Sequence, residues 1–489
     1  MATVVERERK YSGDEGFRLP DLTGCGGVVT MSDATAHDLD AVYLDTPDLR
    51  LARGRCALRR RSGGPDAGWH LKTGAAGGAR TEYQFPAGPD DAGPPAELVA
   101  LVRAAARGGP LAPAARVRTR RRERRLLDGA GRILAEVAED SVEAEDLVSG
   151  ERQAWHELEV ELVDGDEALL DAVQDRLRAA GARPVPVSKS HRALAGRLAA
   201  ADPGPTDPVR AHLATQRDAL IARHPGVLDG DPDAVHDMRV AVRRLRSTLR
   251  TFRGLWDRRE GEEVRAELRR LGGRLGPVRD VQVLAARLDA AVRAEPDELV
   301  LGPVAARLAE RFAAELATAL DELRAALDSD RYTALLRRLD GLAEGPTARR
   351  ADERWIARRV RRAVTRADRR LDRALAAGGE DVALHEARKA YKRARYAVEV
   401  REPAVGKPAT RLRRRLKRLQ DELGAHQDSV VARDALRRAA LAAYADGENT
   451  FTYGLLHARQ ADSAERDVPA LRQAARRARR REVRRWLTR

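Results

Sequence analysis

The first 200 residues alternate between apolar and polar positions in short stretches, which glycine- and proline-rich loops separate. Seven or eight stretches have this pattern, from VVERERKY at 4–11 to WHELEVEL at 155–162. Alternation of period two is typical of β-strands, because successive side chains of a strand point to opposite faces of the sheet. Two further segments, 95–107 and 167–181, have the apolar spacing of helices. The pattern predicts an antiparallel β-barrel or curved sheet with helices beside it.

The rest of the chain has a different pattern. A segment rich in proline, glycine and aspartate, LAAADPGPTDPVRAH at 198–212, reads as a linker. After it, Ala, Leu and Arg recur at helical spacing over long windows, which predicts antiparallel helices in bundles. Helix breaks are expected at Gly272–Gly273, at Gly378–Gly379 and at the EGPTA stretch from Glu344. The sequence therefore predicts an α+β multidomain protein with a β-domain at 1–200 and an all-α domain at 201–489.

Two segments of the helical part repeat one arrangement of charges. VHDMRVAVRRLRSTLR at 235–250 and LHEARKAYKRARYAVE at 384–399 each begin with an apolar residue and a histidine. At 100° per residue the cations that follow form a stripe beside the buried face of an amphipathic helix. The expected anion-binding residues are His236, Arg239, Arg243, Arg244, Arg246 and Arg250 in the first copy, and His385, Arg388, Lys389, Lys392, Arg393 and Arg395 in the second.

A second shared string follows each copy at nearly the same offset. LGPVRD stands at 275–280 and LGAHQD at 423–428, so an internal duplication over about 205–345 and 350–489 accounts for both strings. A histidine at a helix start is commonly a cap and a run of arginines commonly a solvated face. Two copies in matched phase favour an anion site instead, although Glu399 replaces Arg250 in the second. Metal binding by the histidines stays open because of His426 and Asp428.

The distribution of charge supports a polyanionic partner. The chain has a formal net charge of +15, of which residues 1–200 contribute −3 and the remainder +18. Aromatic residues make up only 4% of the sequence and are sparse in the basic segments, with none in 235–250 and Tyr391 and Tyr396 in 384–399. Specific recognition of nucleic acid is therefore not expected.

Composition also excludes several classes of protein. No apolar run approaches the roughly 18 residues of a membrane span, and the N-terminus lacks the apolar segment of a signal peptide. Cys25 and Cys56 provide neither a disulfide framework nor the spacing of a zinc site. We therefore expect a cytoplasmic protein without membrane partners.

Charged residues in the predicted strands share faces in a regular way. Glu6, Glu8 and Lys10 lie on one face of the first strand, and Glu157 and Glu159 on one face of the last. If the apolar faces pack outward against helices, the charged faces line the inside of a barrel. Carboxylates two residues apart can chelate a hard divalent cation, and Arg and Lys bind phosphoryl oxygens. The alternative is a charged face that only contacts water, but acidic pairs at both ends with basic pairs between them favour the lined barrel.

This ordered series resembles the CYTH family of triphosphate tunnel metalloenzymes over about residues 1–200. The first strand, Glu6-x-Glu8-x-Lys10, is similar to the ExExK signature of that family. The other matching motifs, in chain order, are Tyr43-Leu44-Asp45-Thr46-Pro47, Ala57-Leu58-Arg59-Arg60-Arg61, Leu71-Lys72, Arg80-x-Glu82, Arg118-x-Arg120, Glu136 to Asp140, Glu157-x-Glu159 and Ser188-Lys189. Glu139 beside Asp140 departs from the usual pattern of its strand.

The resemblance implies roles for individual residues. Mg²⁺ or Mn²⁺ would be held by Glu6, Glu8, Glu157 and Glu159, with Asp140 or Glu136 sharing in the coordination. Hydrolysis would proceed by attack of water on a terminal phosphorus, with Glu82 orienting a base or a metal-bound water beside Glu6, Glu8 and Lys10. The triphosphate would be held by Lys10, Arg59, Arg61, Lys72, Arg80, Arg118, Arg120 and Lys189.

The class of substrate stays open at this point. The resemblance allows inorganic triphosphate, nucleoside triphosphates, thiamine triphosphate and adenylyl cyclisation. A nucleotide needs an aromatic platform, and Trp69, Trp155 and Tyr43 are candidates that are more commonly core residues. This favours a substrate that consists mostly of phosphate.

The helical part resembles the CHAD family, conserved-histidine α-helical domains that bind polyphosphate, over about residues 205–489. The resemblance rests on H-x-x-R-x-x-x-R-R-x-R and its second copy, and on LGxxxD. The leading hypothesis is a metal-dependent triphosphatase that acts on inorganic triphosphate or polyphosphate ends. The alternatives are a non-catalytic polyphosphate-binding protein associated with granules and a nucleotide-directed enzyme such as an adenylate cyclase or NTPase.

Overall fold

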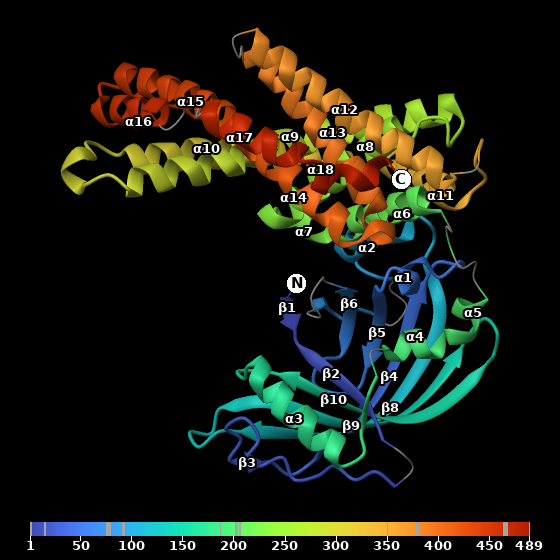
Figure 1. The fold of residues 1–489 in the computed structure, drawn as a ribbon. Helices are drawn as coiled ribbons and strands as arrows, with labels where there is room; N and C mark the ends of the chain where they lie inside the picture. The colour runs from blue at the N-terminus through green and yellow to red at the C-terminus, as the bar shows by residue number, and fades with distance from the viewer. Residues whose placement is uncertain are drawn as a thin grey trace. The chain divides into compact units, whose positions relative to one another are not determined.

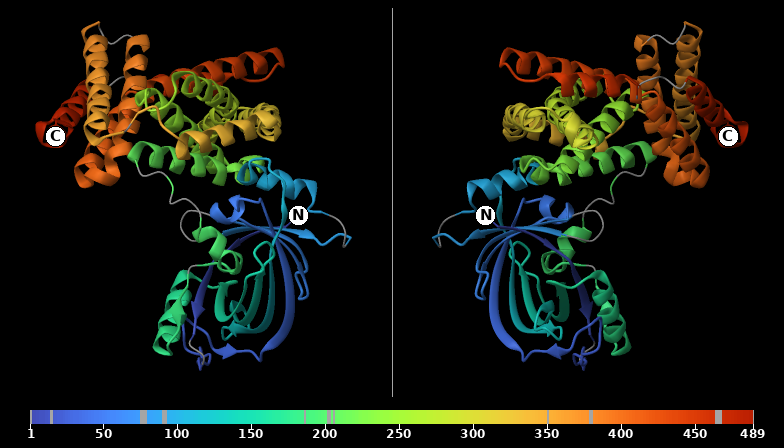
Figure 2. Two further views of the ribbon diagram at one scale, coloured as in Figure 1. Left: turned by 90° about the vertical axis from the view of Figure 1, so that its right-hand side faces the viewer. Right: turned by 90° about the vertical axis from the view of Figure 1, so that its left-hand side faces the viewer.

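The computed structural model describes residues 2–13, 16–74, 80–89, 93–185, 187–200, 204, 207–349, 351–377, 381–462 and 468–488. The chain divides into two compact units, Met1–Pro203 and Gly204–Arg489, which Figures 1 and 2 trace. The first unit is built on a sheet and the second is helical, which confirms the predicted α+β class. The expected break at Gly378–Gly379 lies outside the described residues. None of the described helices combines the length and apolarity that a membrane crossing requires.

The first unit is built around one antiparallel sheet. Its strands pair in the order β1-β7-β6-β5-β4-β8-β9-β10-β2-β11, and β3 pairs with β8. Two helices of this unit, α1 (Arg50–Arg53) and α2 (Ala96–Ala106), lie in the connections between strands. The strands are β1 (Ala2–Glu6), β2 (Glu8–Ser12), β3 (Thr30–Met31), β4 (Thr35–Asp45), β5 (Ala57–Ser62), β6 (Gly68–Gly74), β7 (Arg80–Pro86), β8 (Ala112–Leu127), β9 (Ile133–Asp146), β10 (Arg152–Leu162) and β11 (Arg183–Pro184).

The N-terminal segment joins the two sides of this sheet. β1 pairs with β7 and β2 pairs with β10, yet Arg7 alone separates the two strands. The Leu162 backbone N–H donates to the Arg7 carbonyl at 2.9 Å, so the ladder with β10 runs through the junction. The sheet therefore curls into a tunnel, as Figure 2 shows, and one face of each strand points inward.

An apolar core covers part of the outer face of the sheet. The helix α3 (Glu167–Ala179) begins at Asp166, whose side chain accepts a hydrogen bond from the Leu169 backbone N–H at 3.0 Å. Its buried residues Leu170 and Val173 pack in one cluster with Val137 and Val160 of the sheet. This packing directs the alternate, charged residues of β10 and β2 into the tunnel.

A second core lies on the inner side, so the tunnel wall is partly apolar. Two short helices, α4 (Lys189–Ala193) and α5 (Ala195–Ala199), contribute Ala193 and the residues around it. This cluster contains Tyr43, Val117, Val142 and Trp155 of the sheet. The apolar-outward rule of the sequence prediction therefore does not hold for every strand.

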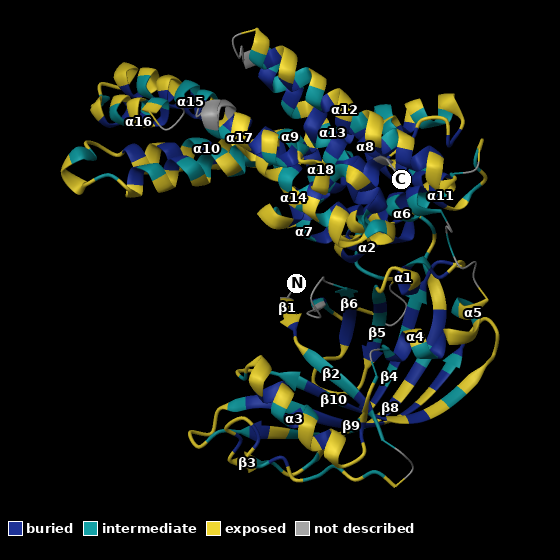
Figure 3. Ribbon diagram, in the orientation of Figure 1, coloured by how far each residue is buried: buried dark blue, intermediate teal, exposed yellow. Residues whose placement is uncertain are grey.

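The second unit consists of helices that pack through continuous apolar stripes, visible as the buried sides in Figure 3. The break expected at Glu344 is confirmed, because α11 ends at that residue. The helices are α6 (Pro208–Ala222), α7 (His224–Leu228), α8 (Pro232–Thr251), α9 (Arg258–Arg293), α10 (Val304–Asp328), α11 (Asp330–Glu344), α12 (Glu353–Ala376), α13 (Asp381–Val405), α14 (Lys407–Glu422), α15 (Ala425–Ala445), α16 (Phe451–Asp462), α17 (Val468–Arg479) and α18 (Arg481–Arg484).

The expected break at Gly272–Gly273 is wrong. Both glycines lie inside α9, which runs unbroken for 36 residues. A Cβ on Gly272 would lie 3.5 Å from Val242, so the glycine belongs to the close packing of α9 on α8 rather than to a turn. In the second copy the equivalent region breaks at Leu423–Gly424, between α14 and α15. The two copies therefore share their charged helices, α8 and α13, but differ in the helix that follows.

Candidate functional site

Charged side chains line a cavity of about 110 Å³ inside the tunnel of the first unit. The alternating residues of β1, β2, β5, β6, β7 and β10 point inward as the period-two pattern predicted. Tyr43, Val117 and Thr119 form a less polar part of the same wall. The lining cations are Lys10, Arg59, Arg61, Lys72, Arg121 and Lys189, and the lining carboxylates are Glu6, Glu8, Asp66, Glu82, Glu159 and Glu161.

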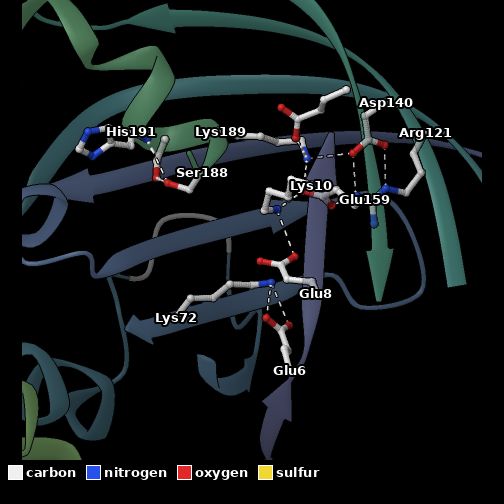
Figure 4. Close-up of polar contacts among 12 residues, drawn as sticks. Glu6, Glu8, Lys10, Lys72, Arg121, Asp140, Glu159, Ser188, Lys189 and His191 are labelled. Atoms are coloured by element: carbon white, nitrogen blue, oxygen red, sulfur yellow. Dashed lines mark hydrogen bonds and ion pairs between the residues drawn. The ribbon is translucent and has the colours of Figure 1, made fainter. Parts of the chain in front are cut away.

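One lysine joins three carboxylates at one end of this network. The Lys189 Nζ lies 2.8 Å from an oxygen of Asp140, 2.6 Å from one of Glu157 and 2.7 Å from one of Glu159. Ser188 caps α4 through its side chain, which fixes the start of the helix that carries Lys189 (Figure 4). The ammonium group therefore takes the point at which the three carboxylates converge.

Two more cations complete this end of the network. Arg121 donates to Asp140 at 2.7 Å and to Glu159 at 2.5 Å, and the Lys10 ammonium donates to Glu159 (Figure 4). Burial alone would raise the pKa of Glu159, but the charges of Lys10, Lys189 and Arg121 outweigh it and hold that pKa well below its ordinary value. Burial would likewise lower the pKa of Lys189, and the surrounding carboxylates raise it instead. Glu159 and Lys189 thus stay charged despite their burial because the oppositely charged groups around them stabilise the charge.

The N-terminal strands form a second group of ion pairs. The Lys72 Nζ lies 2.8 Å from both carboxylate oxygens of Glu6, and the Lys10 Nζ lies 3.1 Å from Glu8 (Figure 4). Burial, aided by a hydrogen bond to Glu82, raises the pKa of Glu6 to about 8. Within the described residues, Glu6 and Glu8 do not belong to a group of three closely spaced ligands. The four glutamates therefore do not converge on one point, although the Lys10 ammonium contacts both Glu8 and Glu159.

Glu82 lies next to Glu6 and receives several donors. The Gln84 side chain donates to it at 2.9 Å, His70 Nδ1 lies 2.9 Å away, and Arg59 and Lys72 lie 3.7 and 3.8 Å away. Burial would raise the pKa of Glu82, but the bond with His70 and the charge of Lys72 hold it well below its usual value. Glu82 is therefore the ionised member of the pair that it forms with Glu6.

The expectation for β8 needs a correction. Arg118 and Arg120 do not line the cavity: both are exposed, and Arg118 pairs with Asp40 at 3.6 Å instead. Val117 and Thr119 face the tunnel, because the core around α4 requires an apolar residue there. Because side chains of a strand alternate between faces, Arg121 lies on the same inward face as Val117 and Thr119. The sequence analysis did not predict this residue.

Two other expectations concern neighbouring strands. The side chain of Arg80 lies outside the described part of the chain, so its predicted phosphate contact stays a prediction. Glu136 pairs with Arg125 at 3.3 Å and Glu139 with Arg124 at 3.8 Å, away from the three convergent carboxylates. Asp140, which is almost fully buried, is the acidic residue that β9 gives to the site.

The helical unit gathers cations along α8 and α13. In the described residues no ion pair joins Arg243, Arg388 or Lys392 to a carboxylate, and the Nε atoms of both arginines are buried without a hydrogen-bond partner. Burial and the charges of Arg388 and Arg243 lower the pKa of Lys392 to about 8. Burial also lowers the pKa of Arg243. The charge of Asp428 opposes the shift of Lys392 only in part, so these three cations form a patch without ion-paired carboxylates, here called the uncompensated patch.

Some of the other cations of the predicted stripes already have partners. Arg244 donates to Glu399 at 2.8 Å, and Arg395 donates to the same carboxylate at 3.1 Å. Lys389 pairs with Glu386 at 3.0 Å. Glu399 is therefore a link between the two copies rather than a weakened phosphate contact, and these cations are less available than the uncompensated patch.

The strings LGPVRD (275–280) and LGAHQD (423–428) contact arginines of the two histidine-containing helices. Arg239 donates to the Gly276 carbonyl at 3.2 Å and to Asp280 at 2.6 Å, so LGPVRD holds the first copy's leading arginine. A Cβ on Gly424 would lie 2.7 Å from Arg388 Nη2, so LGAHQD leaves room for the matching arginine. Burial lowers the pKa of His236 and of His385 at the head of each stripe. The side chain of His426 lies outside the described part of the chain, so metal binding there stays untested.

Comparison with known proteins matches this division of the chain. Residues 5–192 match the family model of the CYTH domain, and residues 211–437 match that of the CHAD domain. Uncharacterized proteins from two strains of Mycobacterium tuberculosis are 37% identical over 494 residues, which cover 95% of this chain and 94% of theirs. The chain belongs to the CYTH–CHAD proteins.

Two solved structures are also similar to the CYTH–CHAD chain. PptA from Streptomyces chartreusis is 22% identical, with a TM-score of 0.44, over 56% of this chain and 99% of its own. The CHAD domain from the plant Ricinus communis is 26% identical, with a TM-score of 0.42, over 56% of this chain and 94% of its own.

The CYTH domain contains a donor set that fits a hard divalent cation. In the described residues, Asp140, Glu157 and Glu159 bring one oxygen each within 4.8 Å of one another. Oxygen donors of this kind suit Mg²⁺ and Mn²⁺. The Lys189 ammonium between them independently marks a position where positive charge is stable. These residues would hold the cation that the CYTH family implies.

The CYTH tunnel offers little to a nucleobase. Trp69 is 3% exposed, Trp155 is 7% exposed and Tyr43 is 6% exposed, so all three belong to packed surroundings. Arg192 covers the ring of Trp155 at 4.4 Å, and the hydroxyl of Tyr43 accepts from Arg59. Trp155 and Tyr43 are thus engaged by arginines of the protein, although Tyr43 also lines the cavity.

The CHAD domain contains further cations that sequence reasoning missed. Burial, together with Arg269 and Arg265 of α9, lowers the pKa of Arg246. Burial and the charges of Arg250 and Arg370 lower that of Arg393 to about 10. The arginines that the sequence analysis missed are Arg265 and Arg269 of α9 and Arg370 of α12. Neither helix has the histidine motif, so their charge did not predict an anion site.

Proposed function

We propose that the CYTH domain is a metal-dependent triphosphatase acting on inorganic triphosphate or polyphosphate ends, and that the CHAD domain binds polyphosphate. The observation that carries the first part is the convergence of Asp140, Glu157 and Glu159 beside a row of tunnel cations. A protein that only binds anions gains nothing from carboxylates in its binding tunnel. The burial of Trp69, Trp155 and Tyr43 supports a substrate without a base.

The tunnel residues divide the work of such a reaction. Lys10, Arg59 and Arg121 would bind phosphoryl oxygens and offset charge that develops on them in the transition state. A bound Mg²⁺ or Mn²⁺ would supply further neutralisation of that charge. Glu82, ionised beside the protonated Glu6, would orient the attacking water as a hydrogen-bond acceptor.

The uncompensated patch carries the second part of the proposal. Arg243, Arg388 and Lys392 form no ion pair with a carboxylate among the described residues, and a phosphate chain would supply the missing negative charge. Association with polyphosphate granules follows from such binding. The burial of Trp69, Trp155 and Tyr43 gives a nucleic acid no open aromatic platform at these three positions.

The test is phosphate release from triphosphate, ATP and long-chain polyphosphate, with Mg²⁺, with Mn²⁺ and with EDTA. We expect metal-dependent release from triphosphate that exceeds release from ATP. Glu159→Gln should lower the rate at least roughly 100-fold, because three cations lose their shared carboxylate. Glu143→Gln, an exposed residue of β9, is the matched control and should retain the rate.

Three results would contradict the proposal in different ways. The absence of metal-dependent release from every substrate leaves a non-catalytic polyphosphate-binding protein. Faster release from ATP than from triphosphate identifies a nucleotide-directed enzyme. Equal rates for Glu159→Gln and Glu143→Gln would mean that the convergent carboxylates take no part in the reaction.

A further inference from the structure

His70 of the CYTH domain is buried at the tunnel wall, and the tunnel chemistry described above does not use it. Its side chain stands on β6 with 1% of the residue exposed. The ring reaches two acceptors: Nδ1 lies 2.9 Å from a carboxylate oxygen of Glu82, and Nε2 lies 2.8 Å from the Asp66 backbone oxygen. A fully buried imidazole with both nitrogens engaged has no rotational freedom.

The direction of the bond to Glu82 follows from the charges around it. Glu82 also receives the Gln84 amide at 2.9 Å and faces Arg59 and Lys72, so it is ionised and accepts. An ionised carboxylate cannot donate, and the proton between the two groups therefore sits on His70 Nδ1. Nδ1 carries the proton in both the Nδ1–H tautomer and the imidazolium, whereas only the imidazolium also donates from Nε2 to the Asp66 carbonyl.

The second nitrogen touches a different part of the wall. The Asp66 carboxylate, in the same loop as the backbone oxygen that Nε2 reaches, pairs with Arg61. Arg61 and Asp66 both line the cavity. One imidazole is thus bonded to a carboxylate on one side and to the loop that holds a phosphate-binding arginine on the other.

We infer that His70 is a positioning residue, which fixes Glu82 in its tunnel-facing orientation by donating from Nδ1. The inference rests on the proposed function, since it assigns Glu82 a partner within that reaction. Glu82 touches the tunnel contents, and His70 acts through it. Without the Nδ1 donor, Glu82 keeps its charge but turns toward Lys72 or Arg59, away from the attacking water.

Two substitutions separate the two bonds. An asparagine amide reaches the position of Nδ1, whereas a glutamine amide reaches that of Nε2. His70→Asn therefore keeps the donor to Glu82, and His70→Gln keeps the donor to the Asp66 carbonyl. We expect His70→Gln to lower kcat for triphosphate roughly 10- to 100-fold with little change in KM, which is the range for residues that orient an active group. His70→Asn should stay within about threefold of the wild-type kcat.

The two variants also expose the competing explanation. If His70 serves only to anchor the Asp66 loop, His70→Asn is the impaired variant and the loss appears in KM through Arg61. If both variants lose the same activity and the same thermal stability, His70 is only a packing residue. Either result overturns the inference.

A double substitution tests the route of the effect. If His70 acts through Glu82, combining His70→Gln with Glu82→Gln costs no more activity than Glu82→Gln alone. Additive losses would contradict the inference.

A spectroscopic readout keeps this test independent of turnover. In ¹⁵N-histidine-labelled full-length protein, the His70 signal is assigned by its loss in His70→Asn, and Nδ1 should carry a proton. An unprotonated Nδ1 overturns the inference even in an active enzyme. If the wild type releases no phosphate while Nδ1 is protonated, the proposed function fails and the bond to Glu82 stands.

Discussion

The tunnel of the CYTH domain and the charged face of the CHAD domain both gather cations, but they balance them differently. In the tunnel, Lys189 has three carboxylate neighbours within 2.8 Å. On α8 and α13, Arg243 and Lys392 form no ion pair with a carboxylate of the described residues, and burial lowers the pKa of both. The same type of side chain is thus compensated in one region and uncompensated in the other.

Under the proposed function, the difference separates two ways to bind a polyanion. In the tunnel, the carboxylates must leave their cations to bind a metal ion, and the cations must leave their carboxylates to bind phosphate. Binding of the metal ion and binding of phosphate therefore depend on each other. An uncompensated patch instead carries a cost in the free protein, since buried cations repel one another, and an anion removes that cost. Removing a charge should therefore have opposite effects on the stability of the two regions.

The largest effect is expected at Lys189. Lys189→Met removes the shared partner of three carboxylates and should lower the free energy of unfolding in EDTA by about 3–5 kcal/mol. Mn²⁺ should restore part of this loss and bind more tightly than to the wild type, because no ammonium competes for the carboxylates. Urea unfolding with and without Mn²⁺ measures both effects. Arg178→Met on the exposed side of α3 is the control. Equal free energies of unfolding for the two variants would show that Lys189 does not stabilise the three carboxylates.

The same chemistry on the CHAD domain should have the reverse effect on stability. Arg243→Met together with Lys392→Met should weaken binding of long-chain polyphosphate about 100-fold, because two charge-assisted contacts are lost. The melting temperature should rise, since two half-buried cations that form no ion pair disappear. Calorimetric titration and thermal unfolding test the pair. Arg259→Met, exposed and paired with Glu263, is the control, and unchanged affinity in the double variant would place the binding site elsewhere.

A smaller contrast lies within one strand of the tunnel. Arg121→Ala should lower triphosphate turnover about 10- to 100-fold, because Arg121 contacts Asp140 and Glu159 at the cavity wall. Arg120→Ala should change turnover less than about twofold, since that side chain is exposed on the outer face. Steady-state kinetics of the two variants measure this difference. If Arg120→Ala lost more turnover than Arg121→Ala, β8 would present its other face to the substrate.

The smallest effect is a dependence on pH. Lys392 has a pKa near 8, so its charge is present below that pH and is lost above it. Polyphosphate affinity should therefore fall a few-fold between about pH 7.5 and 9, as binding begins to require proton uptake. The two histidines of the stripes have lowered pKa values and do not titrate in that window. Lys392→Met should give a flat profile, and a persistent decline in that variant would assign the titration to another group.

The sequence predicted the inward faces of most strands because their polarity alternates cleanly. In β10, Glu157 and Glu159 alternate with Leu158 and Val160, and the structure separates them accordingly. In β8 the run RVRTRRRERR places arginines on both faces, so period two gave no preference. The packing of Val117 under α4 decided the phase, and that contact joins segments far apart in the sequence.

The partners of the charges could not be predicted in the same way. Residue type and helical phase located α8 and α13 and their cations, but Glu399 of one copy neutralises Arg244 of the other. Similarly, Ser188-Lys189 suggested a phosphate contact and gave no sign of three carboxylates around the lysine. Pairing between distant elements depends on their approach in the fold, and a pattern within one element does not contain it.

The single residue between β1 and β2 has a consequence for how the CYTH domain folds. The N-terminal segment pairs Val4 with Glu82 and Tyr11 with Leu158, contacts that span much of the domain and therefore form slowly. Until that segment docks, β7 and β10 present unpaired edges to other chains. Because Glu6 and Glu8 belong to this segment, an unfinished sheet is both prone to aggregate and chemically incomplete. Assembly of the proposed reaction site and protection from aggregation are the same step.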